Sequence, residues 1–120
     1  MDFSSKHIIV TGASTGIGRA TALMLVRKGA TVSLIARSAD KLESLVQEIH
    51  AAGGKGTACV ADVSDRAALA AAIASAIDAN GPPDGLFANA GFGGEFAPFA
   101  NFSDDNWDSL IATNQTSVFV

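Results

Sequence analysis

Five residues near the start of the chain combine glycine and hydroxyl chemistry at a spacing suited to holding phosphate. They are Gly12, Ser14, Thr15, Gly16 and Gly18. An apolar run precedes them and a helical pattern follows. Glycines in this context permit a tight turn, let a pyrophosphate approach the backbone and let the helix pack closely on the strand. The helix start adds free N–H groups and a positive dipole end. The pattern therefore predicts a dinucleotide-binding loop.

The glycines follow the order G-x-x-x-G-x-G, which differs from the commoner G-x-G-x-x-G fingerprint and makes a longer loop. A phosphate-binding loop of the Walker type is excluded, because no Gly-Lys-Ser/Thr sequence follows. The alternative interpretation is a glycine-rich turn without a ligand. Ile17 lies between the last two glycines and starts the helical spacing, which favours the ligand-binding interpretation.

Residues 11–18, with the sequence TGASTGIG, resemble the cofactor loop of the short-chain dehydrogenase/reductase family. That family has a single Rossmann-type domain and uses NAD or NADP to transfer a hydride between nicotinamide and a carbonyl or alcohol carbon. The resemblance runs along the whole chain, which corresponds to about the first half of such a domain. It implies that the cofactor contacts Gly12, Ser14, Thr15, Gly16, Ile17 and Gly18.

The predicted strand over 31–36 ends at Ala36 and is followed by Arg37 and Ser38. NAD-binding proteins place an acidic residue near this point, about 20 positions beyond the loop, to bind the ribose hydroxyls. A carboxylate would repel the extra phosphate of NADP, whereas a guanidinium accepts it. We therefore predict that Arg37 and Ser38 contact the cofactor and that NADP is preferred over NAD. A solvated surface arginine is the alternative, and Thr15 stands where some NADP-preferring family members carry a second basic residue.

Asp62 and Val63 end the third predicted strand. The family resemblance implies that this pair lies against the adenine, with the carboxylate accepting a hydrogen bond from the exocyclic amine. The alternative is an aspartate that only starts a turn before Ser64. The glycine loop earlier in the chain favours the cofactor role.

Asn89, Ala90 and Gly91 follow the fourth predicted strand and match the family's Asn-Asn-Ala-Gly motif from its second residue. Ala88 replaces the first Asn, which puts some of the motif's bracing hydrogen bonds in doubt. The resemblance implies that a cofactor ribose approaches the backbone at these small residues. A simple turn containing an asparagine is the alternative.

Asn114 lies in a segment that resembles a family helix whose asparagine supports the catalytic lysine through a water. Plain hydrogen bonding to backbone is the alternative. The family's reaction also needs Ser, Tyr and Lys, but this chain has no tyrosine and its last lysine is Lys55. We therefore expect the chain alone to be inactive. Its apolar end over 117–120, without a helix cap, indicates C-terminal truncation.

Composition limits the classes of partner. The net charge of −4 argues against binding nucleic acid or an anionic membrane, so phosphate must be held by local features. The single Cys59 predicts a buried, inert thiol without a disulfide. His7 and His50 show no metal-binding spacing, and no metal site is predicted. Without a membrane-spanning run or a signal-peptide pattern, a cytoplasmic location is expected.

Apolar runs and helical spacings alternate along the chain. The predicted strands span 7–11, 31–36, 56–61 and 85–88, and the predicted helices span 16–28, 40–52, 65–79 and a segment after Ser103. Ser64 and Ser103 are the expected N-caps of the last two helices. Short links predict one incomplete α/β domain over 1–120, a doubly wound Rossmann-type parallel sheet with strand order 3-2-1-4. The inward residues are predicted to include Ile77 in the third helix and Trp107, Ile111, Asn114 and Val118 in the fourth.

The sequence therefore predicts the cofactor-binding half of an NADP-preferring oxidoreductase. A small carbonyl or alcohol substrate is expected only if a catalytic half is present. The alternatives are a non-catalytic nucleotide-binding module and a fragment that only folds or assembles. The fourth strand would be an unpaired sheet edge, which predicts self-association into a homo-oligomer, domain swapping or pairing with a complementary fragment. A cluster of phenylalanines is expected to line an apolar pocket or to cover core or an interface: Phe92, Phe96, Phe99 and Phe102.

Overall fold

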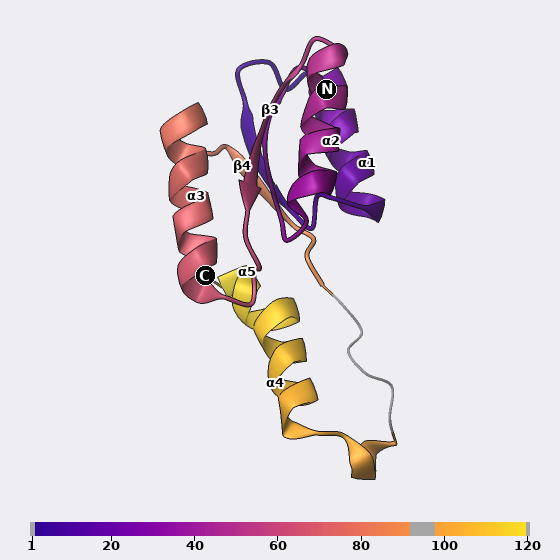
Figure 1. The fold of residues 1–120 in the computed structure, drawn as a ribbon. Coiled ribbons are helices and arrows are strands. Elements are labelled where there is room, and N and C mark those ends of the chain that lie inside the picture. Colours follow the sequence, from indigo (N-terminus) through magenta and orange to yellow (C-terminus); the bar gives the residue numbers. More distant parts are fainter. Residues whose placement is uncertain (1, 92–97, 120) are drawn as a thin grey trace.

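The computed structural model describes residues 2–91 and 98–119 (Figure 1). The strands are β1 (His7–Thr11), β2 (Thr31–Ala36), β3 (Lys55–Val60) and β4 (Gly85–Ala88). The helices are α1 (Gly16–Arg27), α2 (Ala39–Ala51), α3 (Arg66–Asn80), α4 (Asp104–Ile111) and the short α5 (Ser117–Phe119). A 3₁₀ turn, η1 (Phe99–Asn101), precedes α4, and a π-helical turn, η2 (Ala112–Thr116), joins α4 to α5. Strands and helices thus alternate as predicted.

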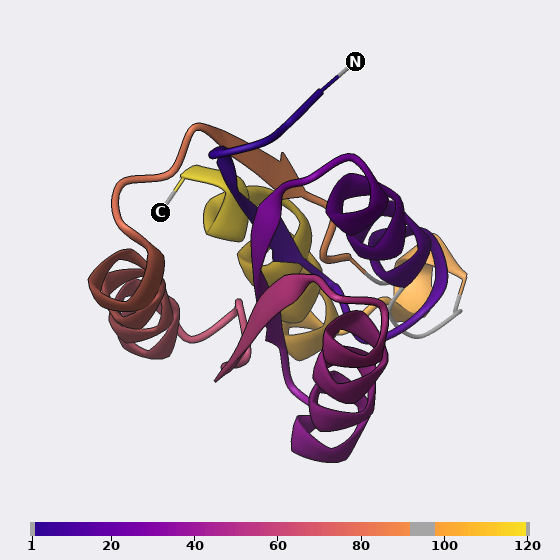
Figure 2. The same ribbon diagram turned by 90° about the horizontal axis from the view of Figure 1, so that it is seen from above.

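The four strands form one parallel sheet in the order β3-β2-β1-β4, which confirms the predicted Rossmann-type topology. Val10 of β1 lies beside Leu34 of β2 and Phe87 of β4. Helices α1 and α2 cover one face of the sheet and α3 lies on the other (Figure 2). Because the central strands are covered on both faces, their sequences are nearly continuous apolar runs.

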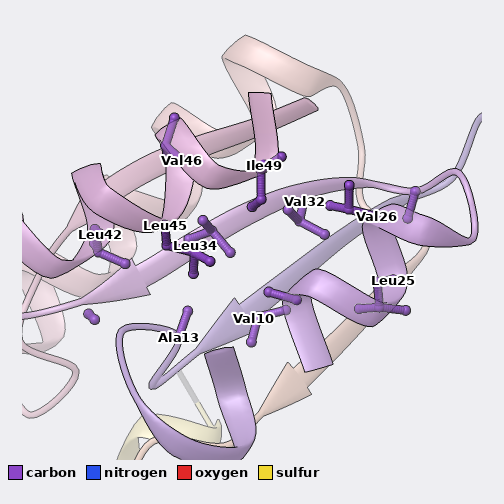
Figure 3. Packing of buried hydrophobic residues seen from close by; sticks show 13 residues of the cluster. Val10, Ala13, Leu25, Val26, Val32, Leu34, Leu42, Leu45, Val46 and Ile49 are labelled. Carbon is purple, nitrogen blue, oxygen red and sulfur yellow. The ribbon is translucent and has the colours of Figure 1, made fainter. Parts of the chain in front are cut away.

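Alternate strand residues enter two separate apolar clusters. Val10 and Leu34 point towards α1 and α2, whereas their neighbours Ile9 and Ile35 point towards α3, as expected from the two-residue repeat of a strand. On the first face the helices contribute Leu25, Val26, Leu42, Leu45, Val46 and Ile49 (Figure 3). On the second face Cys59 joins the cluster, which confirms its predicted burial. The core thus holds β1 and β2 rigidly in the middle of the sheet.

A polar network fastens the amino-terminal edge of the sheet. We call it the amino-edge network, and it consists of His7, Ser33, Thr57, Asn80 and Gly81. His7 Nδ1 lies 2.9 Å from the Gly81 carbonyl oxygen and its Nε2 lies 2.7 Å from Ser33 Oγ. Since a carbonyl only accepts, Nδ1 donates to the Gly81 oxygen, and Nε2 is hydrogen-bonded to the Ser33 hydroxyl. Asn80 Nδ2 donates to Ser33 Oγ at 2.9 Å and to Thr57 Oγ1 at 3.2 Å. These bonds tie the end of α3 to β1, β2 and β3.

The start of α3 differs from the prediction. Asp65, not Ser64, is the N-cap, and its carboxylate accepts a hydrogen bond from the Ala68 amide at 3.1 Å. Ser64 instead donates its hydroxyl to Asp62, so the competing side-chain bond removes it from the capping position. The other predicted cap is present, because Ser103 Oγ accepts from the Asn106 amide at 3.0 Å at the start of α4.

The predicted inward stripe of the fourth helix is wrong for three of its four residues, since only Ile111 is half-buried. Trp107 is 59% exposed, Val118 is 52% exposed, and Asn114 is also exposed. Figure 1 shows the reason: α4 lies beyond the carboxyl edge of the sheet instead of against its face. In α3, Ile77 was also expected to face inward and is 38% exposed.

Two remaining expectations concern the phenylalanine cluster and the membrane. Phe92 and Phe96 lie outside the described residues, as does the side chain of Phe99, while Phe102 is half-buried. None of the described helices is both long enough and apolar enough to cross a lipid bilayer.

Candidate functional site

The loops that follow all four strands meet at the carboxyl edge of the sheet, around an open cavity of about 1260 Å³. Parallel strands bring their carboxyl ends to one edge, which is where open α/β sheets hold their ligands. Twelve predicted site residues line this cavity: Gly12, Ser14, Thr15, Gly16, Ile17, Arg37, Ser38, Asp62, Val63, Asn89, Ala90 and Gly91. Gly18 and Asn114 are not among the lining residues.

The three loop glycines have different surroundings. A Cβ at Gly18 would lie 2.2 Å from the Gly12 carbonyl oxygen, so only glycine lets α1 begin this close to the loop. A Cβ at Gly12 would lie 2.9 Å from Ala90 Cα, and the φ of +65° adds a second reason for glycine. Gly16, with φ +58°, would direct a Cβ into open space, with no atom within 4 Å. Gly18 and Gly12 therefore serve packing, whereas Gly16 faces the cavity.

The start of α1 has neither a side-chain cap nor an acidic residue to interact with its N–H groups and positive dipole end. Its N-cap, Thr15, makes no side-chain capping bond, and the first turn holds no acidic residue. Helix N-termini left in this condition present N–H groups and a positive dipole end to an anion. Together with the open space at Gly16, this arrangement fits the phosphate-binding role expected of the loop.

Thr11 joins the glycine loop to the turn after β4. Its Oγ1 accepts hydrogen bonds from the backbone amides of Asn89 at 3.0 Å and Ala90 at 3.1 Å. Asn89 Nδ2 donates in return to the Gly12 carbonyl at 3.3 Å. These bonds brace the turn although Ala88 replaces the family's first asparagine. The sequence analysis missed the bracing role of Thr11, for which a hydroxyl at the very end of a buried strand was the available signal.

Asp62 is held as a carboxylate at the end of β3. Ser64 donates to its Oδ1 twice, from the hydroxyl at 2.7 Å and from the backbone amide at 2.9 Å. The pKa of Asp62 is lowered, first by the Ser64 side-chain bond, then by the Ser64 backbone bond, with a smaller contribution from the charge of Arg37. Both bonds go to Oδ1, so Oδ2 can accept a donor from the cavity.

Basic groups gather where β2 leads into α2. Arg37 and Ser38, the predicted cofactor-binding residues, line the cavity together with Lys41. Ser38 is the N-cap of α2, and its Oγ accepts from the Lys41 amide at 3.4 Å. The sequence analysis missed Lys41, although its place three residues after a serine N-cap was a usable signal.

A polar face shared by α4 and the following turn η2 forms another wall of the cavity. Asn106, Ser109 and Thr113, at helical spacing, all line it. Because α4 lies beyond the sheet edge, its polar residues and not its apolar stripe face the site. None of these three residues was predicted, because the expected inner face of this helix was the opposite one.

Asn114 lies beside the turn after β4 but outside the cavity wall. A Cβ on Gly91 would come 3.0 Å from Asn114 Oδ1, so the amide packs directly against that glycine. Asn114 belongs to the π-helical turn η2, a distortion that is often found at functional positions. Ser117, which follows η2, donates its hydroxyl to the Thr113 carbonyl at 2.5 Å.

Metal and thiol chemistry find little support in the part of the chain that the structure describes. No three His, Cys, Asp or Glu residues of that part gather where they could hold a metal ion. Burial raises the pKa of the Cys59 thiol, which keeps it protonated and unreactive.

Comparison with known proteins identifies relatives of this arrangement. The family model described as short chain dehydrogenase matches residues 6–120. An uncharacterized oxidoreductase of Listeria monocytogenes is 40% identical over 114 residues, covering 95% of this chain and 46% of that protein. A metagenomic short-chain oxidoreductase in complex with NADP is 39% identical with a TM-score of 0.92, covering 98% of this chain and 53% of that one. L-Sorbose reductase from Gluconobacter frateurii, complexed with NADPH and L-sorbose, is 27% identical with a TM-score of 0.94, covering 99% of this chain and 45% of that one.

These matches extend over nearly the whole of this chain, whereas the chain spans about half the length of the relatives it matches. The family match includes β1 and every loop around the cavity. By its sequence and by its fold, the chain belongs to the short-chain dehydrogenase family.

Proposed function

We propose that the chain binds NADP and forms the cofactor-binding part of an oxidoreductase. The proposal depends on the glycine loop beside the cavity. Gly16 faces open space there, and the side chain of Thr15 does not cap the start of α1, so both are suited to binding a phosphate. The NADP and NADPH complexes of the two similar structures support the choice of cofactor.

Each part of the cofactor has a proposed place. The pyrophosphate lies over the loop at 14–18, and the adenine lies against Val63 with its amine donating to Asp62. The 2′-phosphate lies at Arg37 and Ser38, where a guanidinium and a hydroxyl supply donors. The ribose next to the nicotinamide lies along the turn at 89–91. When bound, NADP supplies the carbon that accepts or gives a hydride.

The reaction proposed for the whole protein is reversible carbonyl reduction or alcohol oxidation. Within it, Asn114 has a positioning role beside Gly91. The sequence contains no tyrosine, the residue that acts as acid and base in this family. For the 120-residue chain by itself, this observation favours a second candidate function, a nucleotide-binding module without turnover.

We also propose that the chain, folding as one domain over 1–120, self-associates. Leu86 lies on the edge strand β4 and is 57% exposed, although β4 pairs with β1 on its other side. Exposed apolar edge strands recruit further strands. Sedimentation equilibrium of the chain is expected to show a homo-oligomer that dissociates on dilution, and a monomer at every concentration would contradict it.

The cofactor proposal is tested by a matched pair of glycine substitutions. Gly16 and Gly53 both have positive φ, and neither would bring a Cβ within 4 Å of another atom. Replacement by alanine therefore costs each variant about 1 kcal/mol of backbone strain. Only Gly16→Ala places a methyl group in the cavity, so we expect about tenfold weaker NADP binding for this variant alone.

Isothermal titration calorimetry of both variants with NADP measures the difference, and urea unfolding verifies that their stabilities match. Equal NADP affinities for Gly16→Ala and Gly53→Ala would contradict the proposed pyrophosphate site. A wild-type chain that binds neither NADP nor NAD would overturn the proposed function as a whole.

A further inference from the structure

Lys41 is a basic residue at the cavity that neither the glycine loop nor the strand ends account for. It lies in the first turn of α2, three residues after the N-cap Ser38, and its side chain lines the cavity together with Arg37. Helical side chains lean towards the N-terminus of their helix, so the lysine stem extends back towards Ser38 and the cavity.

The position of Lys41 is electrostatically unfavourable for the free chain. The first turn of a helix is its positive dipole end, where carboxylates are stabilising and cations are not. Arg37, a second cation, stands just before the same turn. Asp40 in the same turn offsets one positive charge, so two cations stand beside one carboxylate at this helix start, and a ligand anion can supply the remaining complement. An anion between Arg37, Lys41 and the helix start would supply it here.

The distribution of ion pairs also supports an anion site at Arg37 and Lys41. Among the described residues, the only ion pair joins Arg19 of α1 to Glu48 of α2. The side chains of Arg37 and Lys41 thus remain available to a ligand, although Asp40 lies next to Lys41 and Asp62 feels the charge of Arg37. The chain has a net charge of −4, so two cations at one cavity wall make this part of the surface more positive than the chain as a whole.

The cap geometry adds a third donor. Ser38 Oγ accepts the Lys41 amide, which leaves its own O–H proton to be donated elsewhere. The bond also fixes the serine and the first turn of α2 relative to each other. Arg37, Ser38 and Lys41 thus contribute a guanidinium, a hydroxyl and an ammonium group to the part of the cavity wall where β2 leads into α2.

We propose that Lys41 is a specificity-determining residue that binds the 2′-phosphate of NADP opposite Arg37, completing a clamp closed by Ser38. This inference rests on the proposed NADP site and adds a residue to it. Lys41 acts on the phosphate that distinguishes NADP from NAD, so it contributes to discrimination between the two cofactors and not to affinity for their common part.

The test uses 2′,5′-ADP, which carries the distinguishing phosphate, and 5′-AMP, which lacks it. Lys41→Gln removes the charge while keeping a long helix-forming side chain. The matched control is Lys55→Gln, which makes the same charge change at the first residue of β3, on the opposite edge of the sheet. Lys41→Arg keeps the charge and is expected to retain binding. Circular dichroism verifies that each variant is folded.

We expect calorimetry to show about fivefold to twentyfold weaker 2′,5′-ADP binding for Lys41→Gln, as for loss of one charge-assisted contact. Binding of 5′-AMP should be unchanged, and the dependence of 2′,5′-ADP affinity on salt should become shallower. Lys55→Gln should behave as wild type.

Equal 2′,5′-ADP affinities for wild type and Lys41→Gln would overturn the role of Lys41 and leave the NADP proposal standing. Equal losses for 2′,5′-ADP and 5′-AMP would also overturn it, since Lys41 would then not act on the 2′-phosphate. Failure of the wild-type chain to bind either nucleotide would overturn the proposed function as well.

Discussion

Polar residues have different roles at the amino and carboxyl edges of the sheet. At the amino edge, His7, Ser33 and Asn80 bond to one another and to Gly81, so their donors and acceptors are consumed within the protein. At the carboxyl edge, Thr15 makes no side-chain capping bond, and Arg37 is not in an ion pair within the described part of the chain. The polar groups of the amino edge are paired within the protein, whereas Thr15 and Arg37 are exposed and can exchange water for a ligand.

This difference has a cause in the backbone. The amino edge receives the end of α3 and the approach to β4, which pack over it and bring polar side chains together. The carboxyl edge receives the starts of α1 and α2, of which α1 has no side-chain capping bond. A helix start attracts anions and a closed network does not, so the two edges differ in function before any catalytic residue is considered.

Breaking the amino-edge network should have the largest effect on stability. His7→Ala removes the partners of Gly81 and Ser33 and leaves a cavity beside β1, so we expect a loss of about 3 kcal/mol in unfolding free energy. NADP affinity of the folded protein should be unchanged. Urea unfolding followed by circular dichroism measures the loss.

The control is His50→Ala, which alters an exposed histidine in the last turn of α2 and should cost little. Equal stabilities of the two variants would show that the amino-edge network does not hold this edge, and the contrast between the edges would fail.

At the carboxyl edge, a substitution should change binding and leave stability almost untouched. Arg37→Asp replaces an attraction for the 2′-phosphate by a repulsion, so we expect about 100-fold weaker NADP binding, with NAD binding kept or improved. Arg27→Asp makes the same charge change at the end of α1, away from the cavity, and is the control. Calorimetric titration with both cofactors measures the effect, and unaltered NADP affinity in Arg37→Asp would refute the proposed preference.

Most of the fold could be predicted because its signals are local and repeated. The apolar run around Val10 marks a strand, and Gly29 marks the end of a helix. Four strands that alternate with helices are compatible with only a few topologies. The strands at 7–11, 31–36 and 85–88 have the predicted bounds. The start of α3 could not be predicted, because Ser64 and Asp65 are both good caps and the choice depends on Asp62.

The α4 wall of the cavity could not be predicted because it depends on where the helix is placed. Trp107 and Val118 have the spacing of a buried stripe, and only the position of α4 beyond the sheet edge exposes them. The same placement brings Ser109 and Thr113 to the cavity. A helical period gives two faces, but the neighbouring elements decide which of them is the inner one.

Asp62 offers the smallest and most specific test, because it is a carboxyl-edge group that the protein itself partly satisfies. Its pKa is lowered chiefly by the Ser64 hydroxyl, so the carboxylate is stabilised in the folded state. That stability is fully present above the unfolded carboxyl pKa of about 3.9 and is lost as pH falls through the lower folded pKa. Since Asp62 is exposed, screening should limit the effect to less than about 1 kcal/mol.

Ser64→Ala should therefore raise the pKa of Asp62 towards its ordinary value, measured from the carboxyl carbon in an NMR pH titration. Ser44→Ala, an exposed serine on α2, is the control and should leave that pKa unchanged. The NADP affinity of Ser64→Ala near neutral pH should remain close to that of wild type, because the carboxylate is ionised there in either protein. An unshifted pKa would mean that Ser64 does not satisfy Asp62, and the carboxyl edge would then be open at this residue as well.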